Sequence, residues 1–150
     1  MKLLRRHWIL SLIASFALVA TAWAAVVPVA VPSDPGSRIQ VFEIPKGTWA
    51  RRMSGDRVEI LPSEIRLTLG VRDILLLKNL DDVPQIFGPT LIMPGQSFQL
   101  PFEVASSYVF ACTAHVSGQM TIVVEPGPNE NPWTRVRWRL STLWEPERWR

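Results

Sequence analysis

Short hydrophobic runs separated by turn-forming residues recur from position 39 to position 125. Residues 64–69 alternate polar and apolar side chains, which is the two-residue period of a strand with one buried face. Residues 73–79 contain a continuous apolar run and end in a polar turn, which is typical of a strand in a sandwich core. Further strands are expected at residues 39–44, 57–61, 90–93, 96–102, 107–112 and 119–125. No helical period separates these runs, so the pattern predicts an all-β sandwich or barrel without a long helix.

Proline and glycine supply the breaks between these runs. The 150-residue chain contains 13 prolines and 8 glycines, which leave little room for long helices. Hydrophobic residues make up 47% of the chain and charged residues 19%, so we expect a globular structure rather than a disordered chain. The length suits one domain, at residues 38–126, with appendages at both ends.

The N-terminal segment has a different pattern, in which basic side chains precede a long apolar run. The apolar run continues as far as Val31, and small side chains at the −3 and −1 positions permit cleavage before Ala25. The run is also long enough to span a bilayer. Residues 1–24 are therefore interpreted as a signal peptide or as an uncleaved N-terminal membrane anchor. Both interpretations predict an exported protein, either periplasmic or anchored on the extracytoplasmic side of a membrane.

A linker and an unusual segment precede the strands of the expected core. Proline, glycine, serine and aspartate dominate the second half of residues 25–37, which predicts a linker. Residues 38–57 are expected to add an extra hairpin or a long loop. This segment is interpreted either as solvated surface or as a partner-docking surface that uses Trp49, Arg51 and Arg52.

Tryptophan and arginine are concentrated in the C-terminal tail, residues 127–150. Four tryptophans and five arginines lie between positions 133 and 150. A helix in this region would place one apolar face toward a neighbour, formed by Val136, Leu140, Leu143 and Trp144. Two interpretations stay open, a segment at a membrane interface or partner surface, and a frayed end with some packing.

The charge balance of the chain argues against a nucleic-acid partner. The formal charge is +3, but setting aside the basic residues at positions 2, 5 and 6 leaves 13 basic and 13 acidic residues. No basic stripe remains that could follow a phosphate backbone, so nucleic acid is not expected as a partner. The sequence shows neither a Ser/His/Asp set nor a phosphate-binding loop, and we do not expect an enzyme.

One short segment holds three side chains that bind soft metals. Cys112 is the only cysteine, His115 follows it, and Met120 completes a Cys-x2-His-x4-Met spacing. A thiolate, an imidazole and a thioether together suit copper better than hard cations. The cysteine ends one expected strand and the methionine begins the next, so the loop between them can bring the three ligands to one point. The alternative is that these side chains are ordinary core residues.

These motifs together resemble the plastocyanin-like branch of the cupredoxins over residues 58–125. Besides the Cys-His-Met loop, the matching segments lie at residues 62–69, 70–73, 73–79, 94–96 and 108–112. The resemblance implies a Greek-key β-sandwich and a mononuclear copper site used for one-electron transfer. It also implies a fourth ligand, a histidine directly after an Asn-x-Asp-x-x-Pro turn. In this chain the turn occupies residues 79–84, and the next residue is Gln85 instead of histidine.

The glutamine in this position changes which copper functions are expected. An amide oxygen can act as a weak copper ligand, and exchanging a nitrogen donor for such an oxygen favours Cu(I) over Cu(II). We therefore expect a copper protein, for one-electron transfer or for Cu(I) holding and delivery, with the ligands Cys112, His115, Met120 and Gln85. The expected partner is a redox protein or a copper acceptor, with membrane association through the N-terminal segment or the tail. The alternative is a metal-free module that binds a protein partner or supports a membrane complex.

Overall fold

The computed structural model describes residues 2–56 and 59–144, and it divides into two compact units. The strands of the described chain lie in the unit Val31–Gly127, which begins with a 3-10 helix, η1 (Pro35–Arg38). The other unit combines Met1–Ala30 with Pro128–Arg150. It contains the helices α1 (Lys2–Val26) and α3 (Pro132–Trp144). The division of the chain expected from the sequence, after residues 24, 37 and 126, stays a prediction.

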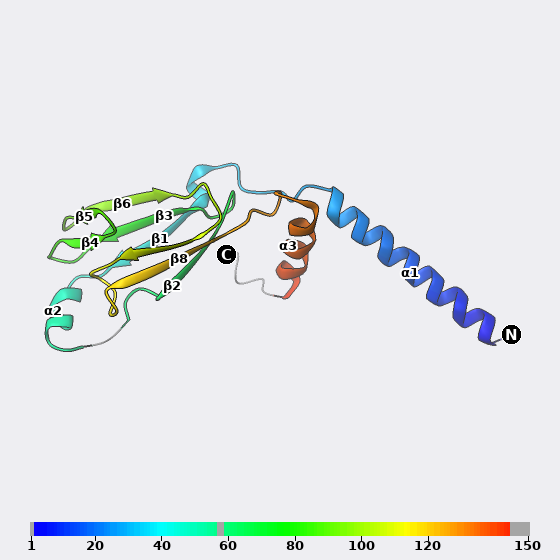
Figure 1. Ribbon diagram of the computed structural model, residues 1–150, viewed down its shortest axis with the longest axis horizontal. Helices are drawn as coiled ribbons and strands as arrows, with labels where there is room; N and C mark the ends of the chain where they lie inside the picture. The colour runs from blue at the N-terminus through cyan, green and yellow to red at the C-terminus, as the bar shows by residue number, and fades with distance from the viewer. Residues whose placement is uncertain (1, 57–58, 145–150) are drawn as a thin grey trace. The chain divides into compact units, whose positions relative to one another are not determined.

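Two three-stranded sheets form the β unit (Figure 1). The strands are, in chain order, β1 (Ile39–Ile44), β2 (Glu64–Thr68), β3 (Ile74–Asn79), β4 (Gln85–Phe87), β5 (Thr90–Ile92), β6 (Ser97–Pro101), β7 (Ser107–Ala111) and β8 (Gln119–Glu125). In one sheet, β3 lies between a parallel β1 and an antiparallel β6. In the other, β8 lies between a parallel β2 and an antiparallel β7. β4 and β5 form a separate antiparallel pair.

The inward faces of the two sheets share one hydrophobic core. Alternate side chains of β8, namely Met120, Ile122 and Val124, are buried, as are Leu75 and Leu77 of β3. All five belong to a single cluster of buried side chains, so the sheets pack face to face as a sandwich. Burying one such side chain completely contributes roughly 1.5–3 kcal/mol.

Most strands expected from the sequence are confirmed, and one is wrong. Seven strands, all except β4, coincide with expected runs to within one residue at each end. Between positions 59 and 125 the described chain contains no helix, as expected. The strand expected at residues 57–61 is wrong for residues 59–61, which form no strand, while positions 57 and 58 lie outside the described residues. Leu61 is buried there, but Pro62 follows it and has no amide hydrogen for a strand ladder.

The expectation of an all-β chain needs a correction, because the fold is mostly β but also has helices. α2 (Thr48–Met53) lies within residues 38–57, where the sequence predicts a hairpin or a long loop. The carboxylate of Asp81 accepts hydrogen bonds from the amides of Gly47 and Trp49, at 2.8 and 2.9 Å. Amides at a helix start lack partners within the helix, so this distant carboxylate stabilises the first turn. Because Asp81 lies far from α2 in the sequence, no local sequence pattern predicts this helix.

Arginine side chains of α3 join the two helices of the other unit. Arg135 donates to the carbonyl of Ala25 at 3.0 Å, and Arg139 donates to that of Val27 at 2.7 Å. Carbonyls at a helix end lack partners within the helix and carry partial negative charge, which explains the attraction of two cations. Arg139 also lies over the ring of Trp23, 4.9 Å from its centroid. Residues 132–144 of the tail therefore form a helix that is hydrogen-bonded to the end of α1.

The membrane and export interpretations stay predictions. Among the described residues, none of the helices combines the length and the hydropathy needed to cross a membrane. On α3, the side chains of Leu140, Leu143 and Trp144 are exposed. The role of this face at a membrane or against a partner is untested, and the tail from position 145 onward lies outside the described residues.

Candidate metal centre

The loop that connects β7 to β8 carries two of the four expected ligands, Cys112 and His115, whereas Met120 lies within β8. The loop begins at Cys112, whose amide donates to the carbonyl of Gly118 at 2.9 Å. The Gly118 amide donates to the carbonyl of His115 at 3.1 Å, and the His115 amide donates to that of Cys112 at 3.3 Å. Gly118 has a φ of 74°, a left-handed conformation that glycine adopts without strain. These bonds close the loop between Cys112 and Gly118, and Met120 follows as the second residue of β8.

All four expected ligands are buried in the described structure. Cys112, His115, Met120 and Gln85 each expose 3% or less of their surface. Cys112 and Met120 belong to the hydrophobic core cluster, and an isolated bridge pairs Cys112 with Phe87. The cysteine and methionine thus contribute to the apolar core.

Burial also controls the protonation of Cys112. It raises the pKa of the thiol, while hydrogen bonds from the amides of Ala114 and His115 and the charge of Arg52 act in the opposite direction. The net shift is upward, so the sulfur carries its proton at neutral pH. Such a thiol is unreactive until a soft cation displaces the proton.

The ring of His115 has one engaged nitrogen and one without a partner. Nδ1 lies 2.8 Å from the hydroxyl of Ser117, which donates to the carbonyl of Gln119 at 2.9 Å. The Nδ1 nitrogen therefore has a hydrogen-bond partner whichever ring nitrogen carries the hydrogen. The Ser117 amide also donates a hydrogen bond to Nδ1, at 3.2 Å. Nε2 is buried and has no hydrogen-bond partner among the residues that the structure describes.

This donor set fits a soft metal ion. Leaving a buried polar atom without a partner costs about 1–3 kcal/mol, a cost that a metal ion bound to Nε2 would remove. The contact between Nδ1 and Ser117 fixes the ring, as outer hydrogen bonds do in metal-binding histidines. Within residues 2–56 and 59–144, no three His, Cys, Asp or Glu side chains are placed to hold a metal ion.

Gln85 lies beside the loop and uses both ends of its amide. Its Oε1 accepts a hydrogen bond from the Thr113 hydroxyl at 2.7 Å, and its Nε2 donates to Asp81 at 3.2 Å. The backbone of Ile86 adds two bonds to Thr113, of 2.8 and 3.1 Å. β4 thus holds Gln85 next to Thr113, the residue that follows Cys112. One lone pair of the Gln85 amide oxygen is already used in the hydrogen bond from Thr113.

Asp81 is a buried carboxylate that the sequence pattern does not reveal as important. It accepts hydrogen bonds from the amides of Gly47, Trp49 and Asp82 and from the side chain of Gln85. Burial raises the pKa of Asp81, but these four hydrogen bonds lower it by more, so the pKa lies below its usual value. The ionised carboxylate connects α2 to β4. Its only signal in the sequence is its place in the Asn-x-Asp-x-x-Pro turn.

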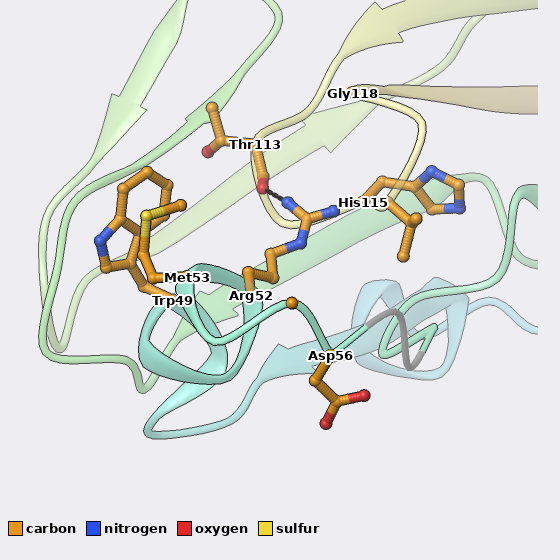
Figure 2. Close-up of a pocket in the computed structure, with 9 residues that line it drawn as sticks. Trp49, Arg52, Met53, Asp56, Thr113, His115 and Gly118 are labelled. Atoms are coloured by element: carbon orange, nitrogen blue, oxygen red, sulfur yellow. Dashed lines mark hydrogen bonds between the residues drawn. The ribbon is translucent and has the colours of Figure 1, made fainter.

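α2 adds side chains that the Cys-His-Met motif does not indicate. Arg52 reaches from α2 to the carbonyl of Thr113, as Figure 2 shows. Together with Trp49, Met53 and His115 it lines a pocket of about 440 Å³ (Figure 2). A pocket of this size is large enough for a small ligand. In the sequence, Trp49 and Arg52 belong to one of two interpretations of residues 38–57, a partner-docking surface, and neither interpretation connects them with the β7–β8 loop.

Comparison with known proteins finds similarity only among solved structures. No protein-family model and no curated protein matches the chain. The chain is similar to a purple cupredoxin from Nitrosopumilus maritimus, at 16% identity over 57% of this chain and 98% of that chain, with a TM-score of 0.40. It is also similar to the amicyanin of Paracoccus versutus (Thiobacillus versutus), at 19% identity over 68% of this chain and 88% of that chain, with a TM-score of 0.40. Because both TM-scores are low, we base the fold on the strand pairing of this chain alone.

Proposed function

We propose that this chain is an exported, cupredoxin-like protein that holds Cu(I) for delivery to a partner. Its ligands are the Cys112 thiolate, the His115 imidazole and the Met120 thioether. The observation that carries the proposal is Nε2 of His115, which is buried and has no hydrogen-bond partner within the described residues. A two-sheet sandwich with parallel β1–β3 and β2–β8 pairs agrees with the fold that the sequence resemblance implies.

The donor set favours Cu(I) over Cu(II). Thiolate and thioether sulfurs are soft donors, whereas Cu(II) prefers several nitrogen or oxygen donors in a square-planar arrangement. Gln85 offers only an oxygen, and that oxygen already accepts from Thr113. The burial of all the proposed ligands also keeps water away from the ion.

Each residue has a separate role in this proposal. Cys112 releases its thiol proton to solvent and binds as the thiolate, which sets most of the affinity. His115 binds through Nε2 while Ser117 fixes its ring, and Met120 adds a neutral sulfur. Gln85 is a weak fourth ligand through its remaining lone pair, and its bond to Thr113 holds β4 against the loop.

A competitive titration with a Cu(I) chelator tests the proposal on the full chain. We expect one Cu(I) per chain, and Cys112→Ser should weaken binding about a hundredfold or more, because a thiolate is replaced by a neutral hydroxyl. Met120→Leu keeps the side-chain volume and should weaken binding about tenfold. Met93→Leu is the matched control, because this methionine is exposed and lies outside the loop. Equal Cu(I) affinity in Cys112→Ser and wild type would contradict the proposal.

The same titration separates the other functions that the sequence leaves open. One-electron transfer requires bound copper to cycle between two oxidation states, so oxidation of the loaded protein should produce an intense thiolate-to-copper absorption. A metal-free module predicts that neither Cu(I) nor Cu(II) binds. His115 Nε2 would then be an unsatisfied buried atom, and the pocket beside α2 would be the candidate partner surface.

A further inference from the structure

The two units of the chain differ in charge. The helical unit, Met1–Ala30 with Pro128–Arg150, holds eight lysines and arginines against three aspartates and glutamates. The β unit, Val31–Gly127, holds eight basic and ten acidic residues, so the positive charge of the chain is concentrated in the helical unit. Charges interact through water over about 10 Å at 0.1 M salt. An anionic surface therefore attracts the helical unit and not the β unit.

α3 presents different side chains on different sides. Arg135 and Arg139 are four residues apart, on the side that donates hydrogen bonds to the carbonyls of Ala25 and Val27. Four exposed residues recur at intervals of four, three and four positions, which places them together on another side of the helix. We call this the outer side of α3, and it consists of Trp133, Arg137, Leu140 and Trp144.

Hydrogen bonds join the end of α1 to α3 and to the residues just before it. Besides the bonds from Arg135 and Arg139, the Val29 amide donates to Oδ1 of Asn129 at 2.8 Å. Nδ2 of Asn129 donates in return to the Val29 carbonyl, at 2.9 Å. These bonds hold residues 25–29, which directly follow the position where the sequence permits cleavage. In the full chain, α1 and α3 are therefore parts of one unit.

Exposed apolar side chains continue from the outer side of α3 onto α1. Leu12, Phe16 and Leu18 expose 63, 78 and 71% of their surface. Apolar area in contact with water costs about 25 cal/mol per Å², so a partner that covers these side chains is favoured. Nucleic acid would neutralise the arginines but leave the apolar side chains in water. A bilayer with anionic headgroups does both, and tryptophan and arginine are typical of its interface.

We propose that the helical unit docks on an anionic lipid bilayer through the outer side of α3. Trp133, Leu140 and Trp144 enter the boundary between headgroups and acyl chains, and Arg137 binds the phosphate of an anionic lipid. α1 stays attached and buries its own apolar side chains in the same bilayer. This docking does not involve the copper ligands, so it goes beyond the proposed function and is independent of it.

A fluorescent label on α3 tests the docking in the full chain. Cys112 is the only cysteine and is buried, so Leu140→Cys supplies the only accessible thiol for a nitrobenzoxadiazole label. We expect vesicles of phosphatidylcholine mixed with phosphatidylglycerol to raise its emission about threefold, because the label leaves water. Vesicles of phosphatidylcholine alone should have a smaller effect. Lipids that carry a nitroxide on the acyl chain should quench the emission.

Leu91→Cys is the matched control for the label on α3. Leu91 lies in β5 of the other unit and exposes 54% of its surface, against 52% for Leu140. The emission of a label at position 91 should not change with either type of vesicle. Arg137→Gln, combined with the label at position 140, tests the charge. It should raise the lipid concentration needed for half of the emission change about threefold to fivefold with anionic vesicles.

Several outcomes would overturn the docking without affecting the Cu(I) titration. Unchanged emission from position 140 in a chain that floats with anionic vesicles would show that α3 stays in water. Equal changes at positions 91 and 140 would show that the outer side of α3 is not the contact. Equal responses to both types of vesicle would exclude recognition of anionic lipid. An emission rise that needs no vesicles and grows with protein concentration would show that a second copy of the chain covers this side.

Discussion

Two buried regions of the β unit are stabilised in opposite ways. The interior of the sandwich is apolar, and Leu75, Leu77 and Ile122 are fully buried there. The end of the sandwich near the β7–β8 loop buries Asp81 and Gln85 almost as completely, but there directed hydrogen bonds hold the two side chains in place. Apolar burial has no preferred direction, whereas a buried polar group needs a partner at a defined distance. The interior therefore stabilises the fold, and the polar end positions α2 and the loop.

The largest effect is expected from a cavity in the apolar interior. Leu77→Ala should lower the free energy of unfolding by about 2–5 kcal/mol, because the lost side chain leaves space that the packed sheets cannot fill. Urea unfolding followed by circular dichroism measures this loss. Val109→Ala is the control, since that β7 side chain is 63% exposed. A loss at Leu77 no larger than at Val109 would contradict the packing described for the interior.

The next effect is expected at the polar end, from the removal of one charge. Asp81→Asn replaces one carboxylate oxygen by an amide that cannot accept the hydrogen bonds of the Gly47 and Trp49 amides together. We expect a loss of about 1.5–3 kcal/mol in the free energy of unfolding, and faster hydrogen exchange at these two amides.

Asp82→Asn is the matched control for that charge removal. The neighbouring carboxylate is 66% exposed and forms a surface ion pair with Lys46 at 3.1 Å. Its loss should change the free energy of unfolding by less than about 0.5 kcal/mol. Hydrogen exchange in α2 that is equally fast in both variants would show that Asp81 does not stabilise the helix.

A smaller effect is expected when Gln85, at the polar end, is replaced by histidine, whose ring nitrogen can bind a metal ion. Gln85→His should tighten Cu(II) binding about tenfold, or about 1.4 kcal/mol, and produce an intense thiolate-to-copper visible absorption. Gln99→His is the control, because this β6 side chain is exposed. Unchanged Cu(II) affinity and an unchanged spectrum would exclude Gln85 from the metal site. Its role would then be limited to its bonds with Thr113 and Asp81.

The smallest effect is expected on the outer surface of the first sheet. Lys78 pairs with Glu43 across β3 and β1 at 3.2 Å, and both side chains are substantially exposed. Lys78→Ala should lower the free energy of unfolding by about 0.5 kcal/mol or less, because water and salt screen the pair. A double-mutant cycle with Glu43→Ala measures the coupling. A coupling as large as the loss in Asp81→Asn would remove the contrast between surface and buried charges.

Local patterns in the sequence predict the strands of the sandwich and miss short elements. β2 is recognisable because a two-residue alternation continues over its whole length, with Ile65 and Leu67 on the buried face. β4 has only three residues, and its buried positions are a glutamine and a phenylalanine, so no apolar alternation marks it. α2 has six residues, too few for a helical period, and its first turn depends on Asp81.

The sequence by itself determined the sandwich strands and the soft donors of one loop, because side-chain period and ligand type are local properties. Only the tertiary structure decided that Asp81 holds α2, that Arg52 reaches Thr113, and that the pocket wall carries Met53. These contacts join positions tens of residues apart and depend on the direction of single hydrogen bonds. A local pattern of polar and apolar positions contains no such information, since it records which residues are buried and not which partners they meet.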